Sequence, residues 1–152
     1  MESAIILLDN LTDQTTKQML HNVVMRKRKF EALEKKYLQW VWAALTATLM
    51  LLFDVYFYIA VPYSYSFAKM FTVFVEGFGH FILLGLALGA NGYMVLMKKK
   101  MDKAEKEYQG LRTEIISKSN ILWEQEESWK SRHKVFEMMK KKFDINLYHE
   151  NK

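Results

Sequence analysis

Residues 77–97, GFGHFILLGLALGANGYMVLM, form a run of 21 positions without an Asp, Glu, Lys or Arg side chain. Because an α-helix rises about 1.5 Å per residue, a run of this length spans the ~30 Å hydrocarbon core of a bilayer. A second apolar run, residues 40–61, has 22 positions and one charged side chain, Asp54. The two runs predict an all-α membrane protein with two transmembrane helices.

Charged side chains are divided sharply along the chain. Residues 38–97 contain one Lys and two acidic residues, whereas residues 1–37 contain 7 Lys/Arg and 5 Asp/Glu, and residues 98–152 contain 14 and 10. This division predicts a cytoplasmic N-terminal amphipathic helix over 1–37, a transmembrane hairpin over 38–97 and a cytoplasmic C-terminal arm over 98–152. Within the hairpin we expect helices at about 40–61 and 70–97, joined by an outer loop at 62–69 that contains the only proline.

The basic residues beside the apolar runs predict the orientation. Eleven Lys/Arg lie within 26–36 and 98–106, whereas the connecting loop has only Lys69. By the positive-inside rule, we expect a multi-pass protein of the cell membrane with both termini in the cytoplasm. These side chains would contact anionic lipid head groups, so the net charge of +5 needs no nucleic acid partner. The run at 140–142 fits a solvated face better than a site for an acidic partner.

Apolar residues recur through the C-terminal arm at alternating steps of four and three residues. This 3.5-residue repeat predicts a long helix in a helical or coiled-coil stalk, packed along a seam within one chain or between chains. Residues 117–120 could interrupt the helix because Ser and Asn favour caps, and we expect fraying after about residue 144. The seam residues are Met101, Tyr108, Leu111, Ile115, Leu122, Trp129 and Phe136.

Small residues in the apolar runs predict close helix packing. Glycines at 85 and 89 form a GxxxG motif, which lets another helix approach closely in lipid. The partner is either the first helix or a second copy of the chain. A hydrogen bond between Thr46 and Asn91, whose expected depths match, would join the two helices. The expected helix-packing residues are Gly85, Gly89, Gly92, Ala43, Ala47, Thr46 and Asn91.

Three ionisable residues, Asp54, Glu76 and His80, lie within the apolar segments. Charges are costly in hydrocarbon, so such side chains usually face a partner or a cavity. On a continuous helix Glu76 and His80 would share a face, being four residues apart. One hypothesis is a cation or proton site; the other, which we favour, is a hydrogen-bonded clamp between the helices with one or both acids protonated.

Motifs for catalysis are missing from the sequence. There is no cysteine, which excludes disulfides, thiolate catalysis and cysteine-ligated metals. The sequence contains no GxSxG, HExxH, Walker A or GxGxxG pattern. We therefore expect no enzyme activity, no cofactor and no dedicated metal site.

Two segments, LEKKYLQW at 33–40 and YQGLRTEIISKSNILW at 108–123, flank the two-helix region. With it, they resemble an uncharacterised family of small bacterial membrane proteins, the family that includes YpbF. The resemblance covers about residues 30–125. It implies a cell-membrane protein and assigns no catalytic residue.

The sequence is thus typical of a structural protein. We expect a self-associating membrane scaffold or accessory subunit, a dimer or higher oligomer, whose cytoplasmic arm binds a cytoplasmic protein partner or further copies. The alternative is a small oligomeric ion or proton channel or transporter that uses Asp54, Glu76 and His80.

Overall fold

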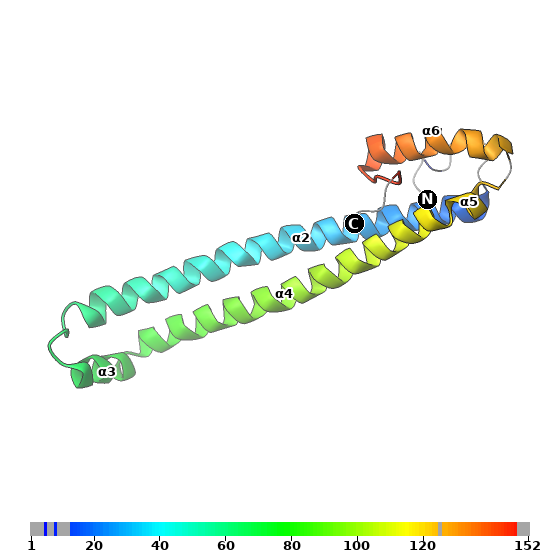
Figure 1. The fold of residues 1–152 in the computed structure, drawn as a ribbon. Coiled ribbons are helices and arrows are strands. Elements are labelled where there is room, and N and C mark those ends of the chain that lie inside the picture. Colours follow the sequence, from blue (N-terminus) through cyan, green and yellow to red (C-terminus); the bar gives the residue numbers. More distant parts are fainter. Residues whose placement is uncertain (1–4, 6–7, 9–12, 125, 149–152) are drawn as a thin grey trace. The chain divides into compact units, whose positions relative to one another are not determined.

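The computed structural model describes residues 5, 8, 13–124 and 126–148, and these contain helices and no strand (Figure 1). The all-α prediction is therefore confirmed. Two helical segments, Gln14–Ala60 and Phe78–Ser117, are long and apolar enough to cross a membrane. The elements are α2 (Gln14–Asp54), the π-helix η1 (Val55–Ala60), α3 (Phe67–Glu76), α4 (Phe78–Ser117), α5 (Ser119–Leu122) and α6 (Glu126–Phe143).

The chain divides into two compact units, which we describe separately. Met1–Ala32 and Asp102–Lys152 form the first, here named the terminal unit. Leu33–Met101 forms the second, here named the apolar unit.

Helix α2 begins beside Asp13, whose Oδ1 accepts a hydrogen bond from the Gln14 backbone N at 2.8 Å. Helix α2 ends at Asp54, and the π-helix η1 follows it directly. At the end of η1, the Val61 N donates a hydrogen bond to the Tyr56 carbonyl at 2.9 Å. Pro62 follows directly and has no backbone N–H to continue a helix. The first apolar helix thus ends at the expected proline.

The second apolar helix differs from the expected 70–97 segment. Helix α3 begins at Phe67, where the Ser66 side chain accepts a hydrogen bond from the Lys69 N at 3.4 Å. It ends at Glu76, and Gly77 is extended, with φ −84° and ψ 96°. Helix α4 then starts at Phe78. The expected continuous helix is therefore broken at Gly77, a residue that costs about 1 kcal/mol relative to Ala inside a helix.

In the apolar unit, three contacts join α2 to α4. The Trp40 ring lies 4.3 Å from that of Tyr93, Asn91 binds Thr48 at 3.0 Å, and His80 contacts Asp54. Only 11% of the most apolar window of each helix is buried. In this unit, the buried apolar side chains are Ala44, Ile59, Ala87 and Met97.

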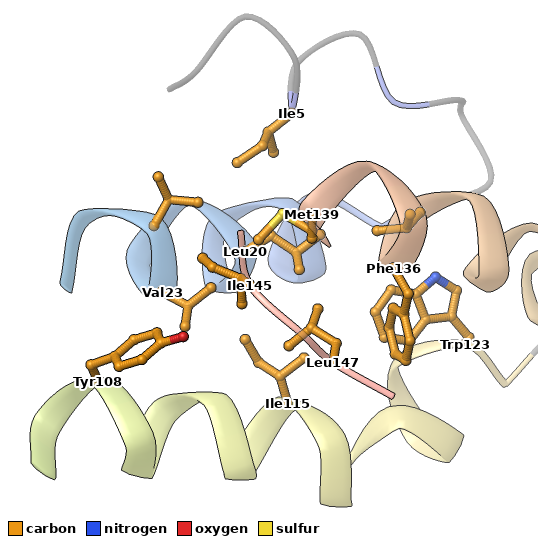
Figure 2. Packing of buried hydrophobic residues seen from close by; sticks show 12 residues of the cluster. Ile5, Leu20, Val23, Tyr108, Ile115, Trp123, Phe136, Met139, Ile145 and Leu147 are labelled. Atoms are coloured by element: carbon orange, nitrogen blue, oxygen red, sulfur yellow. The ribbon is translucent and has the colours of Figure 1, made fainter. Parts of the chain in front are cut away.

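The terminal unit has its own hydrophobic core, in contrast to the apolar unit. Figure 2 shows Tyr108 and Ile115 of α4 facing Val23 of α2, with Phe136 beside Trp123. The Trp123 and Phe136 rings meet edge to face, with centroids 5.6 Å apart. The core comprises Ile5, Leu20, Val23, Val24, Tyr108, Ile115, Trp123, Val135, Phe136, Met139, Ile145 and Leu147.

The C-terminal arm is not one long helix, because α4 ends at Ser117 and α6 packs back over the core of the terminal unit (Figures 1 and 2). The break falls within the expected interruption at 117–120. The expected fraying after residue 144 is wrong for Ile145 and Leu147, whose side chains are 0% and 1% exposed. Residues 149–152 lie outside the described residues. Apolar side chains beyond α6 thus belong to the core.

The end of α6 is held by a lysine from α2. Lys27 Nζ donates to the carbonyls of Phe143 at 2.9 Å and Asp144 at 2.6 Å, and reaches Asp144 Oδ2 at 3.0 Å. The Phe143 carbonyl has no partner within the helix, because the last turn of any helix leaves its carbonyls free. An ammonium group also interacts favourably with the negative end of the helix dipole. Lys27 therefore fixes α6 against α2 within the terminal unit.

Candidate functional site

Asp54 and His80 form a polar contact inside the apolar unit, in which Asp54 Oδ2 contacts His80 Nδ1. Asp54 is the last residue of α2, and His80 lies in the first turn of α4. Their side chains are 17% and 14% exposed, so the pair is largely shielded. A carboxylate bound to one ring nitrogen orients the imidazole and leaves the other nitrogen for acid–base or ligand chemistry.

The imidazole ring is held by two neighbours. Phe74 of α3 stacks on it, with ring centroids 5.8 Å apart and planes 12° apart. On another side lies Gly77, where an added Cβ would overlap His80 Cδ2 and lie 2.7 Å from Nε2. The backbone angles of Gly77 suit any residue, so glycine is needed there for space rather than for conformation. The missing Cβ of Gly77 thus leaves room for the ring.

Asp54 also marks a change in the helix, because η1 begins at the next residue. The Asp54 side chain lines a hollow of about 480 Å³ together with Met50, Phe53, Phe57 and Tyr58. The carboxyl group therefore borders both the imidazole and an open apolar surface.

Glu76, the third ionisable residue of the sequence hypothesis, does not join the pair. It is exposed at the end of α3, and Gly77 separates its helix from that of His80. The expected shared face is therefore lost with the helix break. The described residues contain no group of three His, Cys, Asp or Glu side chains that could hold a metal ion. Within one chain, the site is a pair of residues.

A second polar contact joins the same two helices, with a different partner from the expected one. Asn91 Nδ2 donates to Thr48 Oγ1 at 3.0 Å and to the Ala87 carbonyl at 2.8 Å. Thr46 Oγ1 instead donates to the Trp42 carbonyl at 2.8 Å. The expected Thr46–Asn91 bond is therefore wrong. Thr46 and Thr48 are two positions apart and therefore point to opposite sides of α2. The depth of Thr46 along the helix matched that of Asn91, but its side chain points away from α4.

Among the residues that the structure describes, nothing packs against the GxxxG motif. A Cβ added at Gly85, Gly89 or Gly92 would meet nothing within 4 Å. Ala43 is exposed and Ala47 half-buried. The buried alanines Ala44 and Ala87 lie on the paired faces instead. Of the two expected partners for the motif, the first helix is therefore excluded in this structure.

The expected seam residues divide between the two units. Tyr108, Ile115 and Phe136 belong to the terminal core, and Leu111 and Leu122 pack against it. Met101 is half-buried at the end of the apolar unit. Trp129 is 42% exposed, with the guanidinium group of Arg132 3.7 Å from its ring. The seam pattern missed Trp123, the largest fully buried side chain, because the break after Ser117 changes the helical register.

Comparison with known proteins confirms the resemblance found in the sequence. Residues 19–150 match the family described as "Protein of unknown function (DUF2663)". The chain is 39% identical over 155 residues to "Uncharacterized protein YpbF" of Bacillus subtilis (strain 168), an alignment that covers 100% of both chains. No solved structure matches the chain. The protein therefore belongs to the DUF2663 family.

Proposed function

We propose that this protein is a two-span membrane scaffold that associates with further copies of itself and has both termini in the cytoplasm. The observation that carries the proposal is the exposure of large apolar side chains throughout the apolar unit. Contiguous apolar surface beyond a few hundred Å² marks a protein or membrane interaction site. The exposed residues include Leu45, Leu49, Leu52, Phe53, Phe57, Phe71, Phe78, Ile82, Leu86, Leu88 and Leu96.

Lipid is the surrounding that best fits this surface. The core helix of a soluble protein would be mostly buried, whereas 11% of each apolar window is buried here. The polar groups of Asp54, His80 and Asn91 are paired with one another or with neighbouring groups, as lipid requires. The lysine-rich flanks support a cytoplasmic position for both termini.

The free glycine face of α4 supports self-association. Glycines let helix backbones approach closely in lipid, where packing rather than the hydrophobic effect drives association. Gly85 and Gly89 have open space where a Cβ would lie. We assign this face to a second copy of the chain. The terminal unit, with its own core, would remain outside the membrane to bind a cytoplasmic protein partner.

Oligomer size in mild detergent tests the scaffold. We expect the wild type to be a dimer and the double variant Gly85→Leu/Gly89→Leu to be a monomer. Gly79→Leu is the matched control, because Gly79 lies on the same helix and also has open space around it. A monomeric wild type would contradict self-association, and an unchanged double variant would contradict the assignment of the glycine face.

A second candidate is a small oligomeric ion or proton channel or transporter. The Asp54–His80 contact favours it, because ionisable residues within a membrane commonly mark ion or proton paths. Two helices cannot enclose a pore, so this function requires a ring of several chains. A ring of four or more chains, with ion or proton flux in liposomes, would support the channel over the scaffold.

A further inference from the structure

We propose that Asp54 and His80 form a reversible proton-binding site within the apolar unit. The proposal starts from three features that converge on one ring. Asp54 contacts His80 Nδ1, Phe74 stacks on the imidazole at 5.8 Å, and Gly77 leaves the space that the ring needs. A histidine that only filled space would need neither a carboxyl partner nor a stacked ring to orient its imidazole.

With Asp54 ionised, the contact determines which ring nitrogen takes up the proton. An ionised carboxylate only accepts hydrogen bonds, so Asp54 Oδ2 requires a proton on Nδ1. A neutral imidazole has one protonated nitrogen, so Nε2 then carries a free lone pair. The proton acceptor of the pair is therefore His80 Nε2.

Proton uptake changes the net charge of the pair by one unit. With Asp54 ionised and His80 neutral, the pair carries a charge of −1. A proton bound at Nε2 gives an ion pair of net charge zero. Burial in apolar surroundings disfavours net charge. The ion pair, with a net charge of zero, is therefore the form that best holds α2 and α4 together.

Other titratable groups lie on the elements around the pair. The sites on η1, the turn and α3 are Tyr56, Tyr58, Tyr63, Tyr65, Lys69 and Glu76. Tyr63 is half-buried and the others are exposed. The nearest carboxyl group in sequence to His80 is that of Glu76, so Glu76→Gln is the control for a neighbouring charge.

Nitrogen NMR of the histidine rings tests the proposal on the full chain in lipid nanodiscs. The signals of His80 are identified by their loss in His80→Gln. Across a series of spectra at falling pH, we expect Nδ1 to stay protonated while Nε2 changes from free to protonated. Glu76→Gln should keep this pattern. Asp54→Leu and Gly77→Ala should release the neutral ring from its Nδ1–H form, the first by removing the acceptor and the second by displacing the ring.

The wild-type spectrum decides the matter even if a variant fails to fold. A neutral His80 with its proton on Nε2, or ring nitrogens that do not change with pH, would overturn the proton site. The charge argument rests on the membrane placement in the proposed function. That placement is checked separately, by incorporation into nanodiscs and by oligomer size, so a failed proton site leaves the scaffold standing.

Discussion

Ile145 gives the sharpest test of how the terminal unit is built. It follows α6 and is 0% exposed, in a segment where Asp144 turns the chain with φ 53°. Its N–H donates to the Met139 carbonyl at 3.1 Å, which directs the side chain into the core. Replacing a buried isoleucine by alanine typically costs about 2–5 kcal/mol, from lost apolar contact and the cavity left behind. This is a large share of the roughly 5–15 kcal/mol that stabilises a domain.

Hydrogen exchange of the full chain in detergent or nanodiscs measures this cost. In Ile145→Ala, protected amides of the core helices, such as those of Val23 and Ile115, should exchange roughly thirty- to several-thousand-fold faster, since about 1.4 kcal/mol is a factor of ten. Ile121→Ala is the matched control, because Ile121 is 73% exposed in the same unit. An exposed substitution typically changes stability by no more than about 0.5 kcal/mol. Equal exchange in both variants would refute the packing of the segment after α6.

Three further predictions concern single contacts. Lys27→Met should destabilise the terminal unit by about 1.5–3 kcal/mol in thermal or denaturant unfolding, because the partly buried Phe143 carbonyl loses a charged donor; Lys29→Met, whose side chain is 62% exposed, should cost less than about 1 kcal/mol. Burial raises the pKa of the Tyr108 phenol, opposed by the charges of Lys27 and Arg112. A raised folded-state pKa gives stability that is complete below about pH 10 and is lost as the pH rises further, so Tyr108→Phe should remove this alkaline loss of thermal stability; identical alkaline curves would contradict it. Asn91→Leu should weaken pairing of α2 and α4 by about 0.6–1.7 kcal/mol in mixed-detergent unfolding, and an unchanged midpoint would show that the Thr48 bond contributes nothing.

The sequence predicts the helical class and the apolar helices well, because both depend on local composition. A run without charged residues is apolar wherever it packs, and Pro62 ends a helix through its own missing N–H. The break at Gly77 was not predictable in this way. Glycine is common in membrane helices, and the reason for this one is the His80 ring, which approaches it only in three dimensions.

The packing of α6 against the core of the terminal unit could not be predicted from the sequence for a similar reason. A 3.5-residue repeat records which face is apolar, and the same face suits a partner in another chain or an earlier segment of its own chain. Alternating apolar residues at 145 and 147 were the available signal that the chain after α6 packs in an extended form. Thr48 was missed because depth along a helix does not fix the side to which a residue points.

The central claim, two membrane spans with both termini in the cytoplasm, is tested most directly by cysteine labelling, since the chain has no cysteine of its own. Single cysteines would replace Ser64 in the turn before α3 and Ser117 at the end of α4. With a membrane-impermeant reagent on intact cells, we predict labelling of Ser64→Cys at once and of Ser117→Cys only after the membrane is opened. Labelling of Ser117→Cys in intact cells, or recovery of the protein in the soluble fraction without detergent, would contradict the account.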